Sequence, residues 1–130
     1  MPRLFDPDLT LQNVKSLSPA ALAYIGDAVF ELFVRSHLLM PARKIHDFHL
    51  DVVSHVKAEA QASLAQKIRP ILSEDEENIF RRARNSAMGK PKRVSLQIYQ
   101  QATGFEALLG YLYLTNQKRL EELLEAIQDC

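Results

Sequence analysis

The stretch AALAYIGDAVFELFV, residues 20–34, is the strongest indication of the fold class in this sequence. It is apolar almost all round, and it follows Ser18 and Pro19, which are typical of a helix start because serine caps free backbone amides and proline suits the first turn. We predict a helix from Ser18 to about Met40, where Pro41 ends it. A helix that is apolar all round belongs in a core or an interface.

The rest of the chain also has helical patterns. Residues 1–17 are expected to form an extended lead-in, and residues 88–95 a loop. Helices are expected at about 45–68, 74–85, 96–114 and 117–128, the second of these behind a capping box formed by Ser73 and Glu76. Sustained alternation of apolar and polar residues is missing, so no strand is predicted. The fold class is therefore all-α, a single domain of about five main helices over residues 1–130.

Composition limits the class of protein. Hydrophobic residues make up 47% and charged residues 25%, and no apolar run is long enough to span a membrane. The first residues lack the apolar core of a signal peptide, so we expect a cytoplasmic protein. A single cysteine, Cys130, cannot form an internal disulfide. His46 and His49 lie one helical turn apart but lack further ligands for zinc.

Two acidic residues lie within the two most apolar helices. Asp27 interrupts the first helix, and Glu106 interrupts GFEALLGYLYL, residues 104–114. Neither has a lysine or arginine within about one turn, and burying an unpaired carboxylate is costly. A divalent cation shared by the two would offset that cost, and Mg²⁺ prefers carboxylate oxygens. The glycines Gly26 and Gly110 would let another backbone or a ligand approach each acid closely.

Other interpretations of these acids stay open at this point. A lone acid on an apolar helix often lies at the edge of the buried face or caps a neighbouring helix. Glu31, one turn after Asp27, is either a further ligand or, more simply, a solvated partner for Arg35.

Charge is unevenly distributed, although the 16 basic and 16 acidic residues balance. The acidic cluster at residues 74–77 is followed by a segment with six cations and no acid, from Arg81 to Arg93. Such a segment can grip phosphates, although cations at a helix end also complement the helix dipole. The residues predicted to bind RNA are Arg82, Arg84, Asn85, Lys90, Lys92 and Arg93. Few aromatic residues interleave with them, so a duplex backbone is favoured over stacked single-stranded bases.

At this point the motifs resemble those of the ribonuclease III family. YIGDAVFELFVR, residues 24–35, is similar to its signature helix, and ATGFEALLGYLYL, residues 102–114, to its second acidic motif. Together with Arg84-Asn85-Ser86 they resemble the short Mini-ribonuclease III branch over roughly residues 17–124.

The resemblance implies an all-helical endonuclease domain that hydrolyses double-stranded RNA with Mg²⁺, for which Mn²⁺ can substitute, leaving 5′-phosphate and 3′-hydroxyl ends. It implies that Asp27 and Glu106 are the catalytic metal ligands. It also implies a homodimer, which would account for apolar surface around Phe30 and Phe33. The branch trims the precursor of large-subunit (23S) ribosomal RNA with the help of a large-subunit ribosomal protein.

The sequence departs from full-length ribonuclease III in two respects. No double-stranded RNA-binding domain is expected here, so the nuclease domain itself must grip the substrate. The extra acids of the full-length enzymes correspond here to Ala20, Ala23 and Thr103, which leaves two protein carboxylates per site. The alternatives to a nuclease are a non-catalytic RNA-binding or ribosome-assembly factor on the same fold, and a helical dimerisation module that binds no RNA.

Overall fold

The computed structural model describes residues 9–87 and 94–128. Over these ranges the chain is helical, with no strand, as predicted. The elements are α1 (Leu11–Lys15), α2 (Pro19–His37), α3 (Ile45–Val56), α4 (Ala58–Ile68), the 3₁₀ turn η1 (Arg69–Ile71), α5 (Glu74–Ser86), α6 (Leu96–Thr115) and α7 (Gln117–Gln128). None of the described helices is long and apolar enough to cross a membrane.

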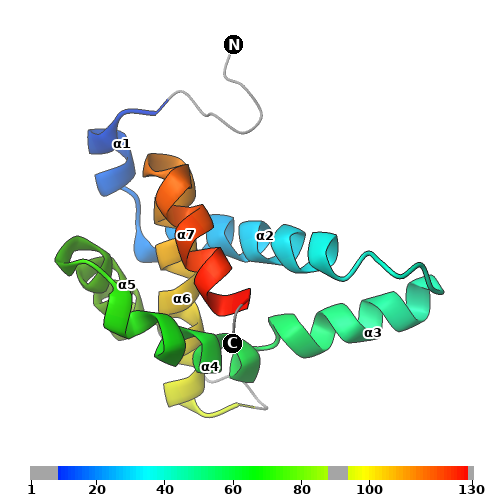
Figure 1. Cartoon of the computed structure of the whole chain (residues 1–130). Coiled ribbons are helices and arrows are strands. Elements are labelled where there is room, and N and C mark those ends of the chain that lie inside the picture. The colour runs from blue at the N-terminus through cyan, green and yellow to red at the C-terminus, as the bar shows by residue number, and fades with distance from the viewer. Residues whose placement is uncertain (1–8, 88–93, 129–130) are drawn as a thin grey trace.

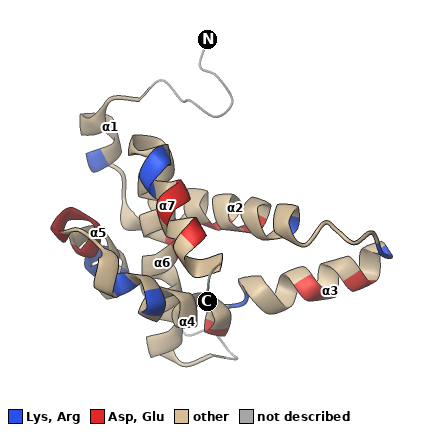
Figure 2. Cartoon of the chain, viewed as in Figure 1, with Lys and Arg blue, Asp and Glu red and all other residues tan. Residues whose placement is uncertain are grey.

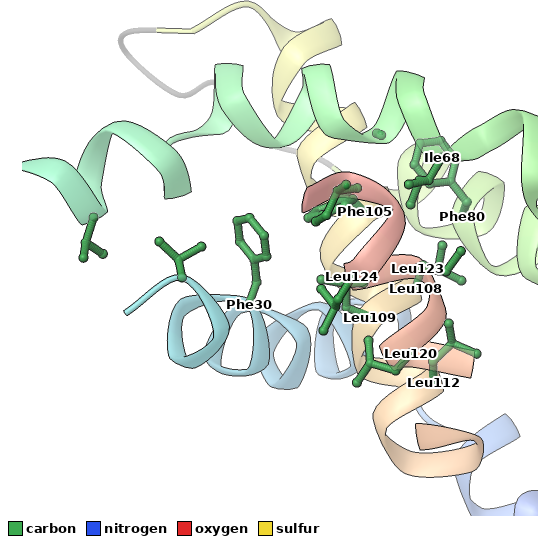
Figure 3. Packing of buried hydrophobic residues seen from close by; sticks show 14 residues of the cluster. Phe30, Ile68, Phe80, Phe105, Leu108, Leu109, Leu112, Leu120, Leu123 and Leu124 are labelled. Carbon is green, nitrogen blue, oxygen red and sulfur yellow. The ribbon is translucent and has the colours of Figure 1, made fainter. Parts of the chain in front are cut away.

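Helix α6 is the centre of the arrangement. It packs most extensively against α2 and also contacts α1, α4, α5 and α7. Its side chains are buried on nearly every side, and Phe105, Ala107 and Leu108 are fully enclosed. In Figure 3 the labelled leucines of α6 and α7 lie together beside Phe30, Ile68, Phe80 and Phe105. The two apolar helices singled out in the sequence therefore form the core pair.

Helices α2 and α3 extend together to one side of the molecule (Figure 1). The second half of α2, the connection through residues 38–44 and all of α3 form this projecting arm. The arm leaves several large apolar side chains exposed, namely Leu32, Leu39, Met40, Ile45, Leu50 and Val53.

Phe30 is not one of these exposed residues, which corrects the prediction that it contributes free apolar surface to a dimer interface. It is 1% exposed in the single chain. Its ring contacts that of Phe105 edge-on, with the ring centroids 5.1 Å apart. Phe33 is half-buried and stacks on Phe30. Phe30 belongs to the core because α2 turns this face toward α6.

Three predicted boundaries needed correction. The expected lead-in contains a short helix, α1, whose capping box is formed by Thr10 and Asn13. The expected helix over 45–68 is broken at Lys57, whose backbone is extended (φ −64°, ψ 158°). Neither proline nor glycine marks this break in the sequence. The first helix ends at His37, three residues before the predicted end.

The capping box before α5 is confirmed. Ser73 Oγ accepts a hydrogen bond from the Glu76 amide at 3.2 Å, and Glu76 Oε1 accepts one from the Ser73 amide at 2.8 Å. Glu76 also accepts hydrogen bonds from Arg119 of α7, at 2.9 and 3.0 Å. Arg119 in turn donates to the Ile71 carbonyl oxygen at 2.7 Å. This network ties α7 and η1 to the start of α5.

Candidate active site

Two glycines set the distance between α2 and α6. A Cβ built on Gly26 would lie 1.6 Å from the Glu106 carbonyl oxygen, and one on Gly110 would lie 2.0 Å from the Leu22 carbonyl oxygen. No side chain fits at either position, so the backbones of the two helices touch directly. The prediction that these glycines permit a close approach is confirmed, and the partner that approaches is the other acidic helix.

This crossing brings Asp27 and Glu106 together. Asp27 directly follows the contact residue Gly26 on α2, and Glu106 is itself the contact residue on α6. The two carboxyl groups lie close enough to share a hydrogen bond. Asp27 is exposed in the single chain, which is more accessible than its apolar neighbours suggested, whereas Glu106 is half-buried. Neither carboxylate forms an ion pair with another described residue.

Burial, reinforced by the neighbouring Asp27 carboxyl, raises the pKa of Glu106 to about 8. A hydrogen bond from the Gln61 side chain acts in the opposite direction. A bound cation would favour the charged form of Glu106, because it would offset both the burial of this carboxylate and its repulsion by Asp27.

An open pocket of about 370 Å³ holds both acids. Its lining is Ala20, Ala23, Tyr24, Asp27, Ser86, Ala87, Tyr99, Thr103 and Glu106. Ala20, Ala23 and Thr103 are the three positions that correspond to the extra acids of the full-length enzymes, and the structure places all three around the acid pair. Within the described part of the chain no group of three or more His, Cys, Asp or Glu side chains could hold a metal. Asp27 and Glu106 are the acidic residues that line this pocket.

A divalent cation fits this donor set. Two oxygen-bearing side chains converge on an open pocket, one of them desolvated and without a positive partner, and Mg²⁺ binds one or two carboxylates while keeping several waters. Glu31 lies outside the pocket lining. It pairs with Arg35 at 2.9 Å, as the simpler of its two interpretations predicted.

The structure places the described members of the predicted RNA-binding set in two different regions. Ser86 and Ala87 line the acid pocket, so the end of α5 that carries Arg84 and Asn85 leads directly to it. Arg84 Nε donates to Asn85 Oδ1 at 3.2 Å. Arg82 is exposed and lines a separate cleft near α1, together with Lys15 and Asp75.

Figure 2 shows the acidic start of α5 and the cations that follow along it. The remaining predicted residues, Lys90, Lys92 and Arg93, lie outside the described residues.

One residue at the site gave no signal in the sequence. Gln61 of α4 is 3% exposed and donates from Nε2 to Glu106 Oε2 at 3.4 Å. The helical stretch AEAQASLAQKI, residues 58–68, contains two glutamines, Gln61 and Gln66, and only the packing of α4 against α6 shows that Gln61 is the buried one.

Comparison with known proteins identifies the family. The model of the ribonuclease III domain matches residues 20–117. A Mini-ribonuclease 3 of Thermosynechococcus vestitus is 54% identical over 111 residues, which cover 85% of this chain and 74% of the relative. The Mini-ribonuclease 3 of a Thermoanaerobacter species is 48% identical over 120 residues, covering 90% of this chain and 84% of the relative.

The fold has a solved counterpart. A crystal structure of a Fusobacterium nucleatum protein superposes with a TM-score of 0.82 at 28% identity, covering 89% of this chain and 97% of that one. Sequence motifs, fold and relatives agree, and the chain belongs to the Mini-ribonuclease 3 branch of the ribonuclease III family and is an endoribonuclease.

Proposed function

We propose that this endoribonuclease hydrolyses phosphodiesters of double-stranded RNA with Mg²⁺, leaving 5′-phosphate and 3′-hydroxyl ends. The observation that carries the proposal is the convergence of Asp27 and Glu106, from two different helices, in one open pocket. When bound, Mg²⁺ would supply a Lewis acid that activates a water and stabilises the leaving oxygen, with Mn²⁺ able to replace it.

The chain's own residues would hold the cation and present it to RNA. Asp27 and Glu106 would each contribute carboxylate oxygens. The rigid crossing of α2 and α6 at Gly26 fixes the spacing of those oxygens before substrate arrives. The small side chains of Ala20 and Ala23 leave room for a phosphate and for metal-bound waters.

The α5 end next to the pocket is the proposed duplex grip. Arg84 and Asn85 lie directly before the pocket residues Ser86 and Ala87. Cations in this position would contact the phosphates flanking the scissile bond, which positions RNA without reading its sequence. Lys90, Lys92 and Arg93 would extend the same surface, and Arg82 would contribute more remotely.

The enzyme is further proposed to act as a homodimer in the cytoplasm, each subunit cutting one strand. The exposed apolar side chains of the projecting arm, such as Leu32 and Ile45, supply area for such an interface. Membership of the Mini-ribonuclease 3 branch makes the precursor of 23S ribosomal RNA the proposed natural substrate, with a large-subunit ribosomal protein assisting.

The decisive experiment is cleavage of a plain RNA duplex across a Mg²⁺ titration, with the product ends identified. Asp27→Asn and Glu106→Gln should each lower the rate by about a thousandfold or more while RNA binding is retained, as expected for groups that hold the reacting centre. Glu31→Gln is the matched control, since it removes a carboxylate from the same helix outside the pocket, and it should leave the rate unchanged. Wild-type rates in either pocket variant, or Mg²⁺-independent cleavage, would refute the proposal.

The natural substrate needs a separate experiment. RNA ends should be mapped in a strain that lacks this protein. Uncut ends at the large-subunit ribosomal RNA precursor are expected, and an unchanged end pattern there would rule this substrate out as the main one.

A further inference from the structure

The side-chain amide of Gln61, next to Glu106, has hydrogen-bond partners for its NH₂ group but none among the described residues for its oxygen. Its Nε2 donates to the Val56 carbonyl oxygen at 2.9 Å and to Glu106 Oε2 at 3.4 Å. Its Oε1 is buried and has no hydrogen-bond partner in the described part of the chain. For the fold alone, an apolar side chain of similar volume would avoid leaving a polar atom unpaired in the interior.

The break between α3 and α4 determines how this amide is oriented. Because Lys57 is extended, the Val56 carbonyl at the end of α3 lies free of the regular helical ladder. Gln61 satisfies that carbonyl, and this requires its NH₂ group, since the amide oxygen would meet another acceptor. The same NH₂ group then reaches Glu106, so the orientation of the amide is set from outside the active site.

The position of Glu106 Oε2 is constrained in consequence. The backbone of Glu106 is held against Gly26, and its side chain is approached by Gln61 from α4 and by Asp27 from α2. The hydrogen bond from Gln61 and the neighbouring Asp27 carboxyl together limit the orientations that the Glu106 side chain can adopt. Its remaining lone pairs are then available on the side of the pocket.

We infer that Gln61 is a positioning residue, which orients the Glu106 carboxylate for a divalent cation through a hydrogen bond relayed from the α3–α4 break. The inference rests on the proposed metal-dependent function. A residue of this kind contacts neither RNA nor metal. Partners that orient metal ligands typically change metal affinity by about 10–100-fold when they are removed, and the long 3.4 Å contact points to the lower end of that range.

The test compares Gln61→Met with Gln101→Met in the full-length protein. Gln101 of α6 also has a buried amide oxygen without a partner, but it makes no described hydrogen bond to Glu106, so it controls for loss of a buried amide. Dissociation constants are measured with MnCl₂ by electron paramagnetic resonance of the free ion. Thermal unfolding is followed in EDTA and in MgCl₂, and duplex cleavage is measured against MgCl₂ concentration.

For Gln61→Met we expect about a tenfold weaker affinity for Mn²⁺ and a similar increase in the half-saturating Mg²⁺ concentration. We also expect a smaller Mg²⁺-induced rise in melting temperature, while the melting temperature in EDTA and metal-free RNA affinity stay near wild type. Gln101→Met should match wild type in Mn²⁺ affinity. Gln61→Leu repeats the experiment with another apolar side chain of similar volume.

Two results would overturn the inference alone: Mn²⁺ affinity in Gln61→Met equal to wild type, or both Gln61 variants failing to fold, since Gln61 would then be a purely structural residue. Absence of metal binding and of metal-dependent cleavage in the wild-type protein would instead refute the proposed function, and the role of Gln61 with it.

Discussion

Gly26 and Glu106 are in direct backbone contact: a Cβ on residue 26 would fall 1.6 Å from the Glu106 carbonyl oxygen. The residue after this glycine is Asp27, and the contact residue on the other helix is Glu106 itself. The closest point of the core helix pair is therefore also the point where the two acids meet. Helix packing and the proposed active site therefore depend on the same backbone contact, so a change at this contact should affect both.

Gly26→Ala should be unusually destabilising for so small a change. The added methyl group cannot be accommodated by a side-chain rotation because it meets backbone, so α2 and α6 must separate. We expect a loss of about 3 kcal/mol or more in the free energy of unfolding, although alanine normally favours a helix over glycine. Gly110→Ala, opposite Leu22, should behave alike.

Chemical denaturation measures this loss. Ala28→Gly, at an exposed position of the same helix, is the control and should cost only about 1 kcal/mol through helix propensity. A Gly26→Ala protein with wild-type stability would show that the helices do not meet at this distance.

The metal-free protein should lose stability as the pH rises through the neutral range. The pKa of Glu106 is raised to about 8 in the folded chain by burial and by Asp27. The folded state therefore binds a proton more tightly than the unfolded state, and stability falls from the unfolded carboxyl pKa up to about pH 8. Melting temperatures in EDTA between pH 4.5 and pH 9 measure this slope.

Glu106→Gln should flatten that slope and raise the melting temperature at pH 8, since the amide has no charge to bury. MgCl₂ should restore stability to the wild-type protein at pH 8 but give little to this variant. Glu31→Gln, which changes an acid outside the pocket, should keep the wild-type slope. A wild-type melting temperature that rises steadily to pH 9 would contradict the raised pKa.

Arg84→Ala should weaken binding to duplex RNA and make it less dependent on salt. Removing one cation from a phosphate reduces the slope of log affinity against log salt concentration by about one unit. Binding is measured in EDTA, so that cleavage does not interfere. Arg35→Ala serves as control, because it removes a cation of α2 that pairs with Glu31 on the same helix, away from α5. Equal salt slopes for the two variants would exclude the α5 end as the grip.

Phe30→Ala should lower the stability of the fold, whereas Leu32→Glu should affect the assembly of subunits. Phe30 is buried against Phe105, so its truncation should cost about 3–5 kcal/mol of stability. Leu32 is 56% exposed, so Leu32→Glu should leave the fold intact. If a homodimer forms through the projecting arm, Leu32→Glu should dissociate its subunits. Analytical ultracentrifugation together with thermal unfolding separates the two effects, and a wild-type monomer would refute the dimer.

Most of the local structure can be predicted from the amino-acid sequence. The helices at 74–86, 96–115 and 117–128 were predicted to within a residue or two, because capping boxes and apolar periodicity are local signals. The break at Lys57 was not predicted, since no proline or glycine marks it in the sequence. Local patterns also singled out Asp27 and Glu106 and the family motifs around them.

Which of these residues lie together depends on the tertiary structure. Asp27 and Glu106 are 79 positions apart in sequence, and their contact depends on two helices crossing where glycines allow backbones to touch. Tertiary packing likewise places Phe30 in the core, Arg82 at another cleft and Gln61 beside Glu106. Periodicity along one helix shows which face is apolar but not what that face meets, and a site made from several helices is defined by those meetings.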